Sequence, residues 1–119
     1  MSDYILIHNP ACSKSRQTLE ILEKANVSFR IYEYLKEELT IEFLASIFKR
    51  LDRKPADYLR KKEKIFLNLD LDLNNTDQII KAVIKHPEIL ERPILLKGSR
   101  GVIGRPVENI LDFINNSTY

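Results

Sequence analysis

The sequence lacks most of the features that would place it outside the ordinary globular proteins. Only 3 Gly and 5 Pro occur in 119 residues, so we expect neither a disordered nor a fibrous chain. No apolar run approaches the roughly 18 residues of a membrane-spanning helix, which predicts no membrane association. A single cysteine, Cys12, cannot form an internal disulfide and excludes a disulfide-stapled secreted fold. The first residues also lack the pattern of a secretion signal, and we expect a cytoplasmic protein.

Size and charge indicate one small domain. The length of 119 residues is too short for two independent cores, which predicts a single domain over residues 1–119. The net charge of +2 is unevenly spread, because eight basic and only three acidic residues lie between Lys49 and Lys64. Such a stretch attracts nucleic acid or small anions. We interpret most of its lysines as a solvated helical face and expect no nucleic-acid partner.

The first third of the chain predicts a strand, a helix and a second strand. Tyr4 to Ile7 is a short apolar run, and Asn9-Pro10 ends it with turn residues. A helix is expected from about Ser13 to Lys24, with Leu19, Leu22 and Ala25 facing inward. Residues 27–34 are rich in β-branched and aromatic side chains. Together these elements predict a right-handed, parallel βαβ unit.

The middle of the chain, from about residue 40 to residue 88, has helical patterns. Thr40 is a predicted N-cap, Pro55 suits the first turn of a short helix, and Thr76 is expected to cap another helix. After this block, Ile94–Leu96 and Val102–Ile103 predict a hairpin across a glycine-containing turn. A closing helix is expected to begin at Pro106, with an inward stripe of Val107, Ile110, Leu111 and Ile114.

The order of these elements predicts an α/β fold. A βαβ half and a ββα half around a mixed sheet resemble the arrangement of thioredoxin. The helical block would then be an insertion between the two halves, at about residues 40–90.

Cys12 lies between the end of a predicted strand and the start of a predicted helix. At such a position, free backbone N–H groups and the positive end of the helix dipole stabilise a thiolate. Lys14, Arg16 and a protonated His8 would add positive charge, and Ser15 offers a hydroxyl. The same amides also bind oxyanions. The alternative is a cysteine packed as a small hydrophobic residue, but its polar neighbours favour the reactive interpretation.

The residues that follow Cys12 limit the classes of enzyme to which this site can belong. Three residues beyond it stands Ser15, so there is no Cys-x-x-Cys pair, and any adduct on Cys12 needs an external thiol. Only three residues separate Cys12 from Arg16, whereas a tyrosine-phosphatase loop needs five to encircle a phosphate. These spacings argue against a self-contained dithiol oxidoreductase and against a phosphatase.

Three arginines stand at predicted element boundaries. Arg60 follows Tyr58-Leu59, Arg92 precedes Pro93 and Arg105 precedes Pro106. Arginine binds multi-oxygen anions through two parallel hydrogen bonds, so these side chains are candidate anion ligands. Each one, taken singly, is better explained as an exposed surface arginine.

The segment His8-Asn9-Pro10-Ala11-Cys12-x-x-Ser15-Arg16 closely resembles the active site of glutaredoxin-dependent arsenate reductases. The resemblance continues in Leu59-Arg60-Lys61, Arg92-Pro93-Ile94 and Gly104-Arg105-Pro106, and residues 98–104 resemble a shorter subgroup. It implies a thioredoxin-like fold with a helical insertion.

The resemblance also assigns expected roles. Cys12 would be the nucleophile, and Arg60, Arg92 and Arg105 would hold arsenate or a similar oxyanion. Pro93 matches the position of the cis-proline that faces the active site in this fold. Glutathione would be the co-substrate, glutaredoxin the reducing partner, and no cofactor would be bound.

Three questions stay open at this level. His8 is either a cation or proton carrier near Cys12 or a strand-end residue bonded to backbone. The enzyme could instead be a thiol-dependent or glutathione-handling reductase with another substrate. A non-enzymatic regulator of the transcription machinery is the third alternative, although Ser15 in place of a second cysteine argues against it. No group of residues has metal-ligand spacing, so we expect no metal.

Overall fold

The computed structural model describes residues 3–116, and its first part is a βαβ unit. Strand β1 (Tyr4–His8) pairs in parallel with β2 (Phe29–Glu33), and helix α1 (Ser13–Lys24) connects them. The predicted bounds of α1 are confirmed, and the second strand is two residues shorter at its start than expected. Met1 and Ser2, part of the segment inspected for a secretion signal, lie outside the described residues.

The last part of the chain completes the sheet. Strands β3 (Ile94–Lys97) and β4 (Arg100–Ile103) form the predicted hairpin, and helix α5 (Glu108–Asn116) follows. Because β3 runs antiparallel to β1, the sheet is mixed, with the order β2-β1-β3-β4. This is the predicted thioredoxin-like arrangement of a βαβ half and a ββα half.

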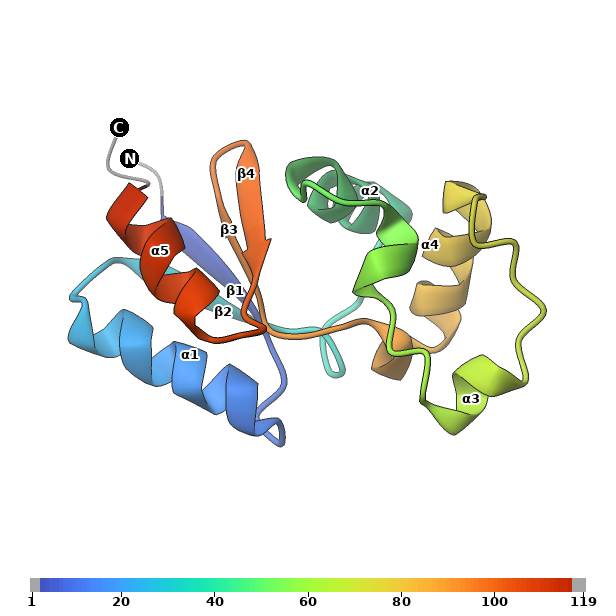
Figure 1. The fold of residues 1–119 in the computed structure, drawn as a ribbon, viewed down its shortest axis with the longest axis horizontal. Coiled ribbons are helices and arrows are strands. Elements are labelled where there is room, and N and C mark those ends of the chain that lie inside the picture. The colour runs from blue at the N-terminus through green and yellow to red at the C-terminus, as the bar shows by residue number, and fades with distance from the viewer. Residues whose placement is uncertain (1–2, 117–119) are drawn as a thin grey trace.

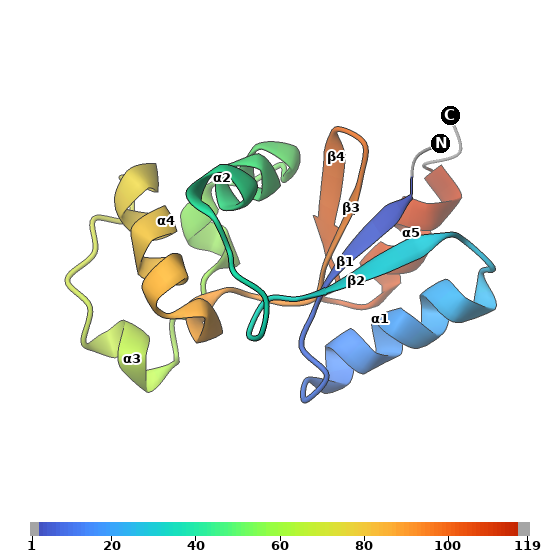
Figure 2. The same cartoon turned by 180° about the vertical axis from the view of Figure 1, so that it is seen from behind.

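The helical insertion lies between the two halves. It consists of α2 (Ile41–Arg50), the 3-10 turn η1 (Pro55–Tyr58), α3 (Lys64–Leu67), α4 (Thr76–Lys85) and the 3-10 turn η2 (Pro87–Ile89). Figures 1 and 2 show it on the opposite side of the sheet from α1 and α5. Both views also show the connections from β2 to α2 and from η2 to β3 crossing the same narrow region between insertion and sheet.

Alternation along the strands creates two apolar cores. Leu6 and Leu95 face α1 and α5, where they pack with Leu22 and Ile110. Residues of the opposite parity, such as Ile7, pack against the helices of the insertion. The sheet is therefore buried on both faces, which explains why its central strands have apolar residues at consecutive positions.

Two predictions about helix starts are wrong by one or two residues. Asn75, not Thr76, caps α4, because its Oδ1 accepts a hydrogen bond from the Gln78 amide at 3.1 Å. Helix α5 begins at Glu108 rather than Pro106, after a turn in which the Pro106 carbonyl accepts from the Asn109 amide. Thr40 does cap α2, as predicted.

Two predicted inward stripes also need correction. On α1, Ala25 is exposed, and the buried face carries the polar residues Ser15 and Thr18 beside Leu22. On α5, Leu111 is 46% exposed, and Phe113 takes the inward position. No helix within residues 3–116 is long and apolar enough to cross a bilayer.

Candidate active site

Cys12 is the N-cap residue of α1, held there by the loop that follows β1. Asn9 organises this loop, since its side-chain oxygen accepts from the Ala11 amide at 3.0 Å and its carbonyl accepts from the Cys12 amide at 2.9 Å. Asn9 in turn donates its own amide to the Ser15 hydroxyl at 3.3 Å. The first turn of α1 contains no acidic residue, so no side chain there neutralises the positive end of the helix dipole.

The local environment lowers the pKa of the Cys12 thiol. Burial of the side chain, which is 8% exposed, acts in the opposite direction, because a charged sulfur is poorly solvated there. Hydrogen bonds from the Ser15 and Lys14 amides, together with the hydrogen bond and positive charge of Arg92, favour the thiolate and outweigh burial. The cysteine therefore has the properties of a nucleophile.

Arg105 and Arg92 reach Cys12 from the ββα half. Arg105 Nη2 lies 3.4 Å from Cys12 Sγ, across 93 positions of sequence. Its Nε donates to the Arg92 carbonyl at 2.7 Å, which fixes the guanidinium beside the thiol. Arg92 Nε is buried and has no hydrogen-bond partner among residues 3–116.

The Arg92-Pro93 bond is cis, as predicted, and Arg105-Pro106 is a second cis bond that the sequence analysis did not anticipate. Gly104 packs beside Pro93, where a Cβ atom would come within 2.7 Å of the proline ring. The Gly104 amide also donates to the Pro93 carbonyl at 2.8 Å. Glycine at this position lets the segment before Arg105 lie directly against the segment after Arg92.

Arg60 reaches the same cluster from the insertion. An isolated bridge between Leu59 and Leu90 aligns the end of η1 with the chain that leads to β3. Arg60 Nη1 then donates to Glu91 Oε1 at 3.1 Å, and Arg60 Nε lies 3.3 Å from Glu63 Oε2. No contact between Arg60 and the Cys12 sulfur appears within the described chain, so the insertion contributes charge rather than a direct bond to the thiol.

His8, Ser15 and Arg16 lie close to Cys12 in sequence but differ in what they do. Burial lowers the pKa of His8, with Glu33 opposing and Arg16 assisting, so the imidazole is neutral at neutral pH. This does not favour the interpretation of His8 as a cation. Arg16 is exposed and donates to the Pro10 carbonyl at 3.0 Å instead of pointing at the sulfur. The fully buried Ser15 contributes its amide to the thiol, while its hydroxyl supports the loop.

Two residues that the sequence analysis did not select lie at this site. Glu91 Oε1 accepts a hydrogen bond from Arg60 Nη1 at 3.1 Å and forms an ion pair with Arg105, whose Nε lies 3.1 Å away. Tyr34, just after β2, is buried, and burial raises the pKa of its phenol against the influence of the nearby Arg92. A charged residue beside Arg92-Pro93 was the only available signal for Glu91. Nothing in the sequence distinguishes Tyr34 from a core aromatic.

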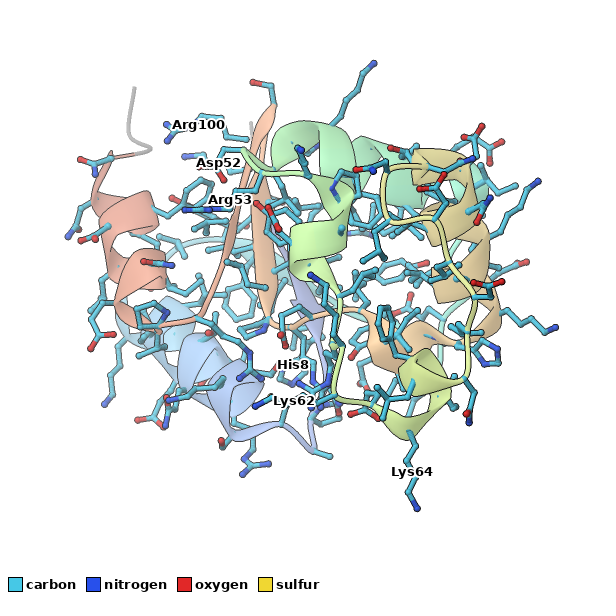
Figure 3. All side chains as sticks on the ribbon, turned by 45° about the vertical axis from the view of Figure 1, so that its right-hand side comes forward. His8, Asp52, Arg53, Lys62, Lys64 and Arg100 are labelled. Carbon is cyan, nitrogen blue, oxygen red and sulfur yellow. The ribbon has the colours of Figure 1, made fainter. Side chains whose placement is uncertain are left out.

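The rest of the basic segment faces solvent. Its lysines, Lys49, Lys54, Lys61, Lys62 and Lys64, are all exposed. In the view of Figure 3, Lys62 lies toward the same end of the molecule as His8, whereas Asp52, Arg53 and Arg100 gather at the opposite end. A hollow of about 360 Å³ lined by those last three residues contains no predicted site residue. No group of three His, Cys, Asp or Glu suited to a metal ion occurs within residues 3–116.

The chain is similar to known proteins over most of its length. Residues 7–113 match the model of the ArsC family. An arsenate reductase of Haemophilus influenzae is 39% identical over 114 residues, which cover 92% of this chain and 97% of that protein. An arsenate reductase of Neisseria meningitidis is 36% identical over 113 residues, with 92% and 97% covered. The solved structure of an arsenate reductase from Vibrio cholerae superposes with a TM-score of 0.84 at 32% identity, covering 92% of this chain and 96% of that one.

Proposed function

Since the chain belongs to the ArsC family, we propose that it reduces arsenate to arsenite, with the Cys12 thiolate as the nucleophile. The observation that carries this proposal is the guanidinium of Arg105 held 3.4 Å from the sulfur of a cysteine with a lowered pKa. A nucleophile and an oxyanion ligand are thus adjacent, as an attack on an arsenic oxyanion requires.

The oxyanion binds where Arg60, Arg92 and Arg105 converge. Arg92 supplies its unpartnered Nε, while Arg105 keeps its outer N–H groups toward Cys12. Guanidinium groups suit a tetrahedral oxyanion because their N–H groups match pairs of oxygens. The amides at the start of α1 add further donors on the side of the thiol.

The first chemical step joins sulfur to arsenic. The Cys12 thiolate donates an electron pair to As(V), a sulfur–arsenic bond forms, and an arsenic–oxygen bond breaks to release hydroxide, which leaves as water after protonation. Arginine charge and helix-start amides stabilise the negative charge that develops on the oxyanion. Arsenic is still As(V) in the resulting adduct on Cys12.

The second step is the reduction, and it requires a thiol from outside the chain. The thiolate of glutathione attacks the Cys12 sulfur, a disulfide forms, and the electron pair of the sulfur–arsenic bond remains on arsenic, which leaves as arsenite. A second thiol, which we propose glutaredoxin delivers, then attacks the mixed disulfide and regenerates the Cys12 thiolate. The chain has only 1 Cys, so both reducing equivalents come from external thiols. Such thiols are abundant in the cytoplasm, where we expect the protein to act.

The test is coupled arsenate reduction by the wild type and by Cys12→Ser, with glutathione and glutaredoxin as reductants. Serine keeps size and polarity but cannot form a thiolate at neutral pH, so activity should fall below detection while circular dichroism is unchanged. Ser13→Ala, next to the nucleophile but exposed, is the matched control and should retain activity. Arsenate turnover by Cys12→Ser would refute the proposed role of the cysteine.

A parallel arm of the same assay identifies the reductant. Replacing glutathione and glutaredoxin with thioredoxin and its reductase should give at most slow turnover if the mixed disulfide forms with glutathione. Efficient turnover with thioredoxin alone would change the proposed partner and leave the first step intact. Faster reduction of glutathione mixed disulfides than of arsenate would favour the alternative of a glutathione-handling reductase.

A further inference from the structure

Glu91 is a carboxylate inside the arginine cluster, and the proposed reaction gives it no role. It lies in the connection between η2 and β3, directly before Arg92. Its Oε1 atom is 3.1 Å from Arg60 Nη1 and 3.1 Å from Arg105 Nε. The Arg92 amide donates to the same carboxylate oxygen at 3.4 Å. A single oxygen atom, Glu91 Oε1, therefore lies close to nitrogen atoms of all three candidate anion ligands.

This contact occurs where an oxyanion would have to bind. The side chains of Glu91, Arg60 and Arg105 are 24%, 25% and 34% exposed, so solutes reach the cluster. Glu91 forms an ion pair with Arg105 close to Nε, which donates to the Arg92 carbonyl, while Arg105 Nη2 contacts the Cys12 sulfur. The carboxylate thus binds the same guanidinium that contacts the thiol, and its negative charge lies close to any anion bound there.

The charged groups of the arginine cluster determine how strongly anions of different charge bind. Three guanidinium groups face three negative groups, the Glu91 and Glu63 carboxylates and the Cys12 thiolate. The charges of the arginines are therefore already balanced before an anion arrives. Because the repulsion between Glu91 and a ligand grows with the charge of the ligand, a dianion is penalised more than a monoanion.

We propose that Glu91 is a specificity determinant, whose fixed carboxylate makes the arginine cluster select singly charged tetrahedral oxyanions over dianions. The inference rests on the proposed oxyanion site, but it does not depend on which thiol reduces the enzyme. A substrate protonated to the monoanion is accepted, and sulfate, a permanent dianion at neutral pH, is disfavoured.

The experiment measures anion binding without any arsenic chemistry. Sulfate and perchlorate are both tetrahedral, but they carry two charges and one charge, respectively. Each is titrated at constant ionic strength, and binding is read from the protection of Cys12 against iodoacetamide. Glu91→Gln keeps the size of the side chain and an oxygen acceptor for the arginines, while it removes the charge.

In Glu91→Gln, the dissociation constant of sulfate should fall about tenfold and that of perchlorate only about threefold, because the electrostatic free energy scales with ligand charge. Glu91→Asp retains the charge and should stay near the wild type for both anions. Equal shifts for the two anions, or no tightening of sulfate, would overturn the proposal. Thermal melting of each variant establishes that it is folded.

Two other glutamates provide matched controls. Glu63→Gln removes a carboxylate that is 3.3 Å from Arg60 Nε and for which no Arg105 contact appears among residues 3–116, and it should tighten sulfate binding less than Glu91→Gln. Glu20→Gln removes the same net charge from an exposed pair with Lys24 on α1 and should leave both dissociation constants unchanged. A shift in Glu20→Gln as large as that in Glu91→Gln would mean a general charge effect and would overturn the proposal.

The outcomes also separate this inference from the proposed function. A selective sulfate shift in Glu91→Gln with no arsenate turnover by the wild type would contradict arsenate reduction and retain the specificity role. Normal arsenate turnover by the wild type with no selective sulfate shift in Glu91→Gln would retain arsenate reduction and contradict the specificity role. Absence of protection by either anion, in wild type and variant alike, would overturn the specificity role, and the arsenate assay would then decide the proposed function by itself.

Discussion

The sheet half of the molecule and the helical insertion contribute to the active site in different ways. The sheet half supplies Cys12, Arg92 and Arg105, which come within hydrogen-bonding distance of one another around the sulfur. The insertion supplies Arg60, which forms an ion pair with Glu91 rather than a contact with the thiol. In the proposed reaction, the sheet half would therefore carry the chemistry at sulfur, and the insertion would adjust how the anion is held.

The difference in anchoring has a structural cause. Cys12 and Arg105 stand at ends of elements that pack on the central strands, where both faces of the sheet are buried. Arg60 follows the short turn η1, and the bridge between Leu59 and Leu90 and the ion pair with Glu91 link it to the chain that leads to β3. A site divided in this way lets anion affinity change without moving the nucleophile.

Arg105→Gln should show the largest effect, because it removes the charge that touches the sulfur. We expect kcat/KM for arsenate to fall by roughly 10²–10³-fold, as for loss of one preorganised donor to developing negative charge. Steady-state kinetics with glutathione and glutaredoxin measure it. Arg100→Gln, whose guanidinium lies over the Phe113 ring, is the control and should keep wild-type rates. Similar rates for Arg105→Gln and wild type would remove the distinction between the two regions.

Arg60→Gln should have a smaller effect and a different kinetic form. Since Arg60 is proposed to hold the anion and lies away from the sulfur, KM for arsenate should rise about tenfold while kcat changes little. Lys61→Gln removes an exposed charge next to it in sequence and serves as the control. A fall in kcat without a change in KM would place Arg60 in the chemical step and contradict the division of roles.

His8→Gln should have the smallest effect on the thiol. A lowered pKa keeps His8 neutral, so its removal takes no charge from Cys12. The midpoint of the pH profile for iodoacetamide alkylation should therefore move by less than about 0.3 pH units. Arg92→Gln, by contrast, should move this midpoint upward, because Arg92 donates a hydrogen bond and a positive charge to the thiolate. A large upward shift in His8→Gln would restore the interpretation of His8 as a cation.

Sequence patterns predicted best where local chemistry decides the structure. The bounds of α1 were predictable because turn residues precede it and its apolar residues recur with helical period. The cap of α4 was misplaced by one residue, since Asn75 and Thr76 are both capable of capping and only the fold decides between them. The buried polar face of α1 was not predictable either, because Ser15 and Thr18 resemble surface residues in the sequence.

In the candidate site, too, some residues could be predicted from the local sequence and others could not. Cys12 was identifiable from its place between a strand and a helix, and the three arginines from their motifs. The contact of Glu91 with Arg60 spans 31 positions, and no local pattern encodes it. Arg16 was expected to add charge near Cys12, but helix geometry directs it to the Pro10 carbonyl. Residue type and local sequence were therefore enough to select Cys12 and the arginines. They were not enough to predict the contacts that Glu91 and Arg16 make.

The Ser15 hydroxyl limits how this scaffold can be redesigned as a self-sufficient dithiol catalyst. Cysteine at that position would create the Cys-x-x-Cys spacing and a resolving thiol within the chain, although the disulfide formed in each turnover would still need an outside reductant. The side chain there is fully buried, however, and its oxygen accepts from the Asn9 amide at 3.3 Å. Sulfur is bulkier and a weaker acceptor, so the loop would lose part of its support. A second redox centre would have to be introduced together with a new partner for that amide.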